Sequence, residues 1–309
     1  MRKLLSCTGG GAKFIEIIIA LDRIIKGGYR PTDIIVKSSS ALAILFVILG
    51  KYLEGYKEGA DLDLKKFFKS PPTDGKGQLT LSAKFRAIWS FMPSVIGGDI
   101  NSFGVQDVRP LLLKYISDAD FELYRNGPYP NIWIVTVDPS KGTQGEYLHF
   151  DNLKDCANVK TAADLIEASA QIQGNTEGVY IGDSHRFDGG MYLAGAAGYM
   201  IKNNFFENVA ETVSIYSYTD SHYGTKDSDS YKKDIGSNAA RIIEMLKNSN
   251  KYFCREHESE LCINRGIKRL EVNLPDVIDN LYGADAETVN RAILETEIKM
   301  DKYLSEYKF

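Results

Sequence analysis

The sequence has 309 residues, of which 44% are hydrophobic and 25% are charged, and its formal net charge is −4. This length and composition are those of a globular protein with a large buried core. The acidic balance excludes general binding of nucleic acid through a basic surface, so we predict no nucleic-acid partner.

Four cysteines are present, and none of them forms a CxxC pair. Cys254 and Cys262 flank His257, but this spacing matches no common zinc pattern. We therefore predict free thiols in a reducing compartment, and neither a metal nor another cofactor.

The N-terminus, MRKLLSC, begins like a lipoprotein signal, but glycines follow soon after Leu4 and Leu5. A signal peptide needs an apolar run of roughly 7–15 residues. The longest apolar run, Ala41 to Leu49, is also shorter than the roughly 20 residues that span a bilayer. We expect a soluble, cytoplasmic protein whose contact with membranes is at most peripheral.

The first fifty residues contain two successive units of strand, turn and helix. An apolar segment at Lys3–Cys7 runs into a glycine cluster, and apolar residues at helical spacing follow at Phe14–Ile25. A second strand is predicted at Asp33–Val36, followed by three serines and an apolar helix at about Ala41–Leu49. Such a series predicts an α/β fold with a mostly parallel sheet and helices on both faces.

The segment from about 59 to 104 has a different character and is a candidate inserted cap or lid. Its apolar stripe consists of Phe85, Ile88, Trp89, Phe91 and Met92. Two interpretations stay open, because such a stripe is typical of a helix packed on the core and also of a lid or lipid-facing surface.

The remaining segments continue the alternation of strands and helices. Strands are predicted at Asn131–Val137, Glu146–Phe150, Gly178–Ile181, Arg186–Phe187 and Val213–Tyr218, the second pairing with the first. Helices are predicted at Thr161–Gln171, with Thr161 as its N-cap, near Ser237–Lys247, and at Ala286–Tyr307.

Three glycines, Gly9, Gly10 and Gly11, lie between the first predicted strand and the first helix. Glycines allow a sharp turn, and N–H groups at a helix N-terminus suit an anion, either a phosphate or a transient oxyanion. The spacing is neither the G-x-G-x-x-G of a dinucleotide fold nor a P-loop.

A serine cluster, Ser38 to Ser40, lies on the second strand-to-helix turn. A serine on such a turn is presented to substrate, and the amide after it can join an oxyanion hole. The serines are equally typical of a helix N-cap. Asp188 precedes Gly189 and Gly190 at a predicted strand end, where it is either a catalytic carboxylate or part of a turn.

In this order, the three features resemble the patatin-like phospholipase family, which has a glycine-rich oxyanion loop, a G-x-S-x-G elbow and a later D-G-G or D-G-A. Thr8–Lys13, Pro31–Ala43 and Glu167–Ile172 resemble its oxyanion motif, its elbow and the segment before its catalytic Asp. The resemblance implies one three-layer α/β/α patatin-like domain over 1–309. Its core would span about 1–220, with the insertion at 59–104 and a mostly helical extension at 221–309.

The resemblance also implies hydrolysis of a phospholipid or other acyl-ester lipid by a phospholipase A type reaction. Ser39 would be the nucleophile and Asp188 its base, in a Ser–Asp dyad that needs no metal. The oxyanion hole would be formed by Gly9, Gly10, Gly11 and the amide of Ser40. Lys13 and Lys37 are candidates for binding an anionic part of the substrate.

The elbow departs from the family pattern, because Lys37 and Ala41 stand where the two glycines are expected. Shifting the register by one residue would make Ser40 the nucleophile and place Leu42 at a glycine position, where its bulk favours Ser39 instead. Two function classes follow: an active lipid acyl hydrolase, or a catalytically inactive relative that binds lipid or a protein partner.

Overall fold

The computed structural model describes residues 1–60, 107–141, 148–171, 178–191, 193, 195–217, 255–278, 284–307 and 309. The apolar stripe from Phe85 to Met92, most of the segment 59–104 and the helix predicted near Ser237–Lys247 lie outside these residues.

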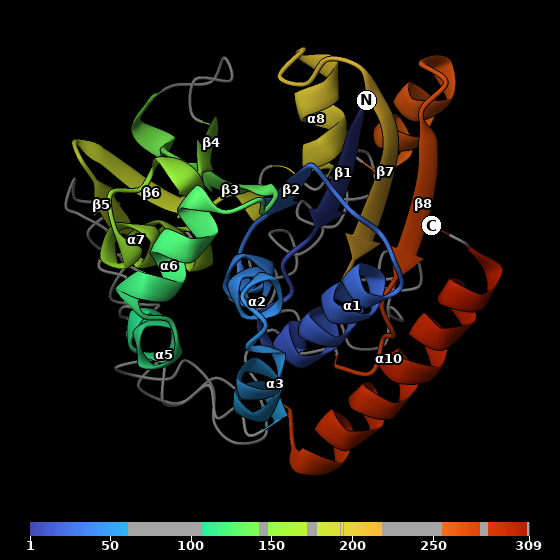
Figure 1. The fold of residues 1–309 in the computed structure, drawn as a ribbon, viewed down its shortest axis with the longest axis horizontal. Helices are drawn as coiled ribbons and strands as arrows, with labels where there is room; N and C mark the ends of the chain where they lie inside the picture. The colour runs from blue at the N-terminus through green and yellow to red at the C-terminus, as the bar shows by residue number, and fades with distance from the viewer. Residues whose placement is uncertain are drawn as a thin grey trace, which may run out of the picture.

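The centre of the fold is an 8-stranded sheet in the order β5-β6-β3-β2-β1-β7-β8, with β4 paired to β3 (Figure 1). The strands are β1 (Arg2–Cys7), β2 (Asp33–Val36), β3 (Asn131–Val137), β4 (Leu148–Asn152), β5 (Val179–Ile181), β6 (Ser184–Asp188), β7 (Val209–Tyr216) and β8 (Lys268–Asn273). Strands β3, β2, β1, β7 and β8 pair in parallel, whereas β4 and β6 run antiparallel to β3. The prediction of a mostly parallel sheet is confirmed.

Helices cover both faces of this sheet. They are α1 (Phe14–Lys26), α2 (Ser39–Ile48), α3 (Tyr52–Ala60), α5 (Arg109–Tyr115), α6 (Asp118–Asn126), α7 (Val159–Ala170), α8 (Ala196–Lys202) and α10 (Ala286–Glu306), and residues 255–264 are also helical. Leu5 and Ile34 face the core that α1, α2, α7 and α10 complete, whereas Leu4 and Ile35 face α8. Because neighbouring strand residues point to opposite faces, the result is the three-layer α/β/α arrangement.

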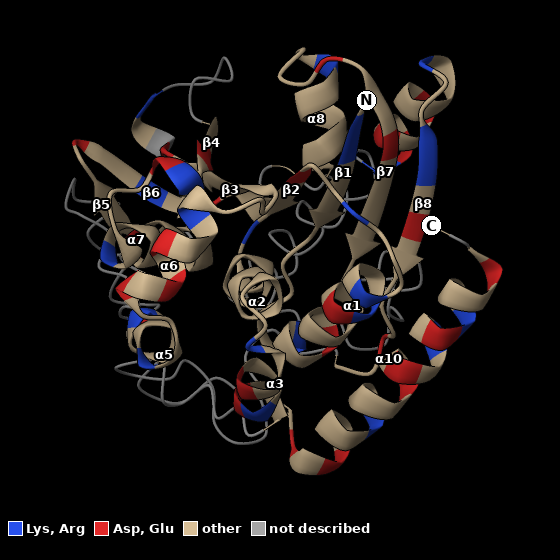
Figure 2. Ribbon diagram, in the orientation of Figure 1, with Lys and Arg blue, Asp and Glu red and all other residues tan. Residues whose placement is uncertain are grey.

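Helix α2 lies at the centre of its layer. It contacts α1, α3 and α7 and carries no charged residue (Figure 2). Its burial explains this composition, because an ionised side chain there would lose its hydration without gaining a partner. None of the helices in the described ranges has both the length and the apolar composition needed to cross a bilayer.

The C-terminal region, expected to be mostly helical, contributes strand β8 to the sheet, paired in parallel with β7. Leu270 and Val272 enter the core, while their neighbours along the strand are less buried. This alternation is confined to six residues, which is too short to identify a strand with certainty from sequence.

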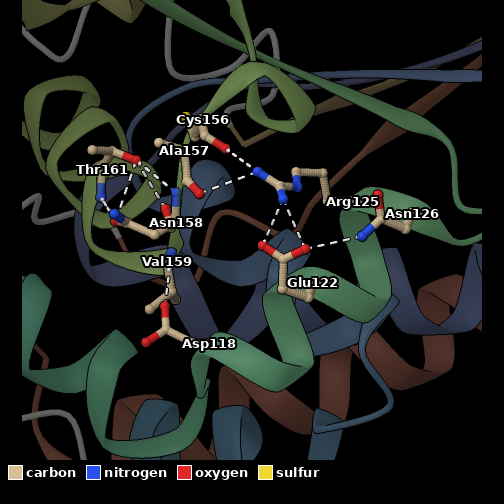
Figure 3. Close-up of polar contacts among 9 residues, drawn as sticks. All are labelled: Asp118, Glu122, Arg125, Asn126, Cys156, Ala157, Asn158, Val159 and Thr161. Carbon is tan, nitrogen blue, oxygen red and sulfur yellow. Dashed lines mark hydrogen bonds and ion pairs between the residues drawn. The ribbon is translucent and has the colours of Figure 1, made fainter.

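Helix α7 begins with a capping box in which Asn158 is the N-cap and Thr161 is the third helical residue (Figure 3). The Asn158 side chain accepts a hydrogen bond from Thr161 N at 3.0 Å, and Thr161 Oγ1 accepts one from Asn158 N at 3.2 Å. The prediction of Thr161 as N-cap is therefore wrong by three residues, because a capping box uses polar side chains at both positions.

Helix α6 holds the start of α7 in place (Figure 3). Arg125 donates hydrogen bonds to the carbonyl groups of Cys156 and Ala157, at 3.4 and 3.1 Å. The Asp118 carboxylate accepts a hydrogen bond from Val159 N at 3.4 Å. These contacts fix the direction in which α7 runs towards the sheet, and its far end carries Ser169.

Candidate active site

The predicted site residues meet at one edge of the sheet because of the strand register. Cys7 pairs with Val36, and Val36 pairs with Ile134. Two residues further along the chain, Gly9 follows the end of β1 and Ser38 follows the end of β2. In β3 the corresponding residue is Thr136, which pairs with Asp188. The glycine loop, the serine cluster and the Asp188 turn therefore lie side by side.

The glycine loop packs directly on the serine turn. A Cβ atom on Gly9 would lie 2.1 Å from Ser38 Cβ and 2.9 Å from the carbonyl oxygen of Lys37. Gly11 has a φ of +53°, in the left-handed region that favours glycine. Position 9 therefore requires glycine because a side chain has no room there, and position 11 requires it because of the backbone conformation.

Ser38 holds the strained position of the turn, with φ 56° and ψ −137°. Positive φ is uncommon for serine, and among the described residues only Ser38, Asn204 and Asn208 combine it with a side chain. The motif in the sequence predicts the strained nucleophile position at Ser39. The structure places the strain one residue earlier, because α2 begins at Ser39 instead of Ala41.

Ser39 and Ser40 have different surroundings. Ser39 Oγ accepts a hydrogen bond from the Gly10 amide at 2.9 Å. Ser40 is fully buried, and its Oγ lies 3.0 Å from the Cys7 carbonyl and 2.7 Å from the Lys37 carbonyl. The Ser40 amide donates to the Lys37 carbonyl at 3.2 Å. The Ser40 amide, predicted to join the oxyanion hole, is thus bonded within the turn in this structure.

The end of α7 contributes Ser169, a residue to which the sequence patterns assign no role. Ser169 Oγ accepts a hydrogen bond from Ser38 N at 2.9 Å and donates to the Val135 carbonyl at 2.9 Å. Ser169 thus joins the strained turn to β3. Ser169 lies within Glu167–Ile172, the segment that resembles the one before the family's catalytic Asp. That resemblance was the one sequence feature that could have drawn attention to Ser169.

Asp188 ends β6 beside this turn and is 5% exposed. Its Oδ1 accepts a hydrogen bond from Gly190 N at 2.6 Å, and its own amide donates to the Gln171 carbonyl at 2.7 Å. The carboxylate is therefore held by the last residue of the Asp-Gly-Gly turn.

Both lysines predicted to bind an anion are buried and bonded to the protein. Lys13, 1% exposed, donates to the Pro275 carbonyl at 2.7 Å, and its ammonium lies 3.6 Å from Glu16 and 3.7 Å from Asp276. Lys37, 2% exposed, donates to the Leu193 carbonyl. A buried ammonium needs such partners. The structure therefore gives both groups partners inside the protein, and their contact with an anionic substrate stays a prediction.

Burial also sets the protonation of groups near the loop. Burial raises the pKa of the Cys7 thiol to about 12, so the thiol is neutral and is no nucleophile. Burial raises the pKa of Glu16 to about 7, against the opposing effect of the Lys13 ammonium. Within the described ranges, no three His, Cys, Asp or Glu side chains are grouped so that they could hold a metal ion.

No protein-family model matches the chain, and no curated protein matches it. Among the similar solved structures is the crystal structure of VipD from Legionella pneumophila, at 13% identity and a TM-score of 0.44, covering 97% of this chain and 67% of that one. Another is the type III effector protein ExoU, at 12% identity and a TM-score of 0.40, covering 98% of this chain and 52% of that one. Similarities this distant say nothing about activity, which has to be inferred from the geometry of the site.

Proposed function

We propose that this protein is a patatin-like serine acyl hydrolase in which Ser38 is the nucleophile and Asp188 is the general base. The observation that carries the proposal is the left-handed backbone of Ser38, on a strand-to-helix turn that packs against Gly9. A nucleophile elbow needs such a turn, because the strained backbone holds the serine side chain away from both strand and helix.

Hydrogen bonds around the turn hold Ser38 in its strained backbone conformation. Backbone strain persists only where neighbouring groups over-determine the conformation. Here the Ser38 amide is bonded to Ser169, and the Ser40 side chain is bonded to the backbone of Cys7 and Lys37. These contacts come from three separate segments of the chain.

Taking Ser38 as nucleophile changes which residues stand at the family's glycine positions. They become Val36 and Ser40, in place of Lys37 and Ala41. Val36 is the buried last residue of β2, and Ser40 turns its small side chain towards the Cys7 carbonyl. Neither side chain obstructs the turn, which favours an active enzyme over a catalytically inactive relative.

In the proposed reaction, Asp188 accepts the hydroxyl proton of Ser38 as Oγ attacks the ester carbonyl carbon. The N–H groups of Gly9 and Gly11 and the Ser39 amide stabilise the resulting oxyanion, while the Gly10 amide stays bonded to Ser39 Oγ. The intermediate collapses to an acyl-serine, and Asp188 returns the proton to the departing alcohol. Water then attacks the acyl-serine, which releases the fatty acid and restores both side chains.

The substrate class rests on the family resemblance, which implies a phospholipid or another acyl-ester lipid. Such a substrate would require peripheral contact with a membrane or a lipid particle. Hydrolysis of fluorescent phospholipids in vesicles, compared with soluble short-chain esters, would measure this preference.

The test of the proposal is labelling of the intact protein with a fluorophosphonate, which reacts with activated serines, followed by peptide mapping. We expect the label on Ser38, lost in both Ser38→Ala and Asp188→Asn and retained in Ser39→Ala. A label on Ser39 would restore the register predicted from the sequence. A folded protein that takes no label would support the inactive relative, and vesicle binding would then be measured.

A further inference from the structure

Lys37 is a buried cation within the elbow itself. It directly precedes Ser38, and its ammonium donates a hydrogen bond to the Leu193 carbonyl. Leu193 N in turn donates to the Gly189 carbonyl at 3.0 Å, which closes the turn that follows Asp188. The Lys37 side chain therefore connects the proposed nucleophile turn with the proposed base turn.

The Asp188 carboxylate lies close to the same side chain. A Cβ atom placed on Gly190 would lie 2.9 Å from Asp188 Oδ1 and 3.5 Å from Lys37 Cδ. Asp188 Oδ1 and Lys37 Cδ thus both lie next to the same position beside Gly190. The ammonium of Lys37 is two bonds beyond Cδ. The ammonium and the carboxylate therefore belong to neighbouring turns, and opposite charges that are near one another interact more strongly where water is excluded.

Other charged groups near Asp188 have partners of their own in the described part of the chain. Arg186, on the same strand, contacts Ser184, Thr136 and Asp151. Asp138, at the end of β3, accepts hydrogen bonds from Ser140 and Ser184.

Further titratable groups lie on α7, which packs against β6, and on β4, which pairs with β3. Glu167 of α7 is paired with Arg109 at 2.9 Å. His149 of β4 has its pKa lowered by burial and by Arg186. Lys37 is therefore the cation that the elbow itself supplies.

We propose that Lys37 is a positioning residue that keeps the Asp188 carboxylate ionised and holds the Asp188–Leu193 turn against the elbow. This inference rests on the proposed function for its catalytic meaning, but the electrostatic contact can be measured without activity. An Asp at 5% exposure without a nearby cation would take up a proton more readily, because burial disfavours the charged form. A protonated Asp188 could not accept the proton of Ser38.

The experiment measures the titration of Asp188 by ¹³C NMR of the full-length protein with carboxyl-labelled aspartate, assigned through Asp188→Asn. We expect a wild-type midpoint at or below the ordinary value of roughly 4. We expect a rise of about one pH unit or more in both Lys37→Gln and Lys37→Met. Gln can still donate to the Leu193 carbonyl and Met cannot, so the pair separates charge from turn closure.

Lys51→Met is the matched control, because Lys51 is a part-buried lysine bonded to Asp120 and to the Tyr115 carbonyl. It should leave the Asp188 midpoint unchanged. A wild-type midpoint above about 5, or unchanged midpoints in folded Lys37 variants, would overturn the inference. If both variants fail to fold, a wild-type midpoint above about 5 would still overturn the inference.

Fluorophosphonate labelling of the same proteins separates this inference from the proposed function. With an active wild type, the acid limb of the labelling rate should move to higher pH in Lys37→Gln, in step with the NMR midpoint. Absence of label from wild type would overturn the proposed function, while the NMR titration would still decide whether Lys37 acts on Asp188.

Discussion

The close approach of Gly9 to Ser38 predicts a severe effect of the substitution Gly9→Ala. The added methyl group would lie 2.1 Å from Ser38 Cβ, 2.8 Å from Ser38 Oγ and 2.9 Å from the Lys37 carbonyl oxygen. Real Cβ atoms essentially never lie within 3.0 Å of another heavy atom, so something must move. A rotamer change of Ser38 could move Oγ, but not Cβ or the Lys37 carbonyl.

Relief of the 2.1 Å contact therefore requires the loop and the elbow to separate by about 1 Å. A displacement of that size between reacting groups costs about 10²-fold in rate. Overpacking of this kind also lowers the free energy of unfolding by about 1–3 kcal/mol. We expect Gly9→Ala to slow fluorophosphonate labelling of Ser38 by about 10²-fold or more.

Two variants control for crowding in general. Gly10→Ala would place its methyl group 3.0 Å from Lys13 Cβ and from Ser217 Cβ, so its effect on labelling should be smaller. Gly55→Ala in α3 would meet the end of the Ile18 side chain at 2.4 Å, which should lower stability without changing the labelling rate. Labelling rates come from mass spectrometry and stabilities from urea denaturation. Labelling of folded Gly9→Ala at the wild-type rate would refute this role of the loop.

Two further predictions concern stability. Asn158→Ala removes the N-cap bond of α7 and should lower the free energy of unfolding by about 1 kcal/mol, and an unchanged urea midpoint would contradict the capping role. Folding raises the pKa of Glu16 from 4.5 to about 7, so the unfolded chain releases this proton at lower pH than the folded protein does. The free energy of unfolding of the wild type therefore falls as the pH rises from about 4.5 to 7. Because glutamine does not titrate, the stability of Glu16→Gln relative to wild type should increase by about 3 kcal/mol across that window. A difference that stays constant with pH would show that Glu16 is not the responsible group.

The sequence by itself determined the elements that have strong local signals. The two strand–turn–helix units at the N-terminus, the strand at Asn131–Val137 and the long C-terminal helix all follow from apolar periodicity. The order of a glycine loop, a serine turn and an Asp-Gly-Gly turn also carried the resemblance to the patatin-like phospholipase family. These features depend on neighbouring residues, so they can be recognised without knowing the fold.

Only the tertiary structure decided which serine occupies the strained position and what the two lysines contact. Ser38, Ser39 and Ser40 are chemically identical, and their roles differ because Ser169, Gly10 and Cys7 each bind a different one. Likewise, Lys13 and Lys37 resemble anion ligands in sequence, but in the structure they donate hydrogen bonds to the carbonyl groups of Pro275 and Leu193. These partners lie 29 to 262 residues away along the chain, so the choice between neighbouring residues is made by the packing of distant segments.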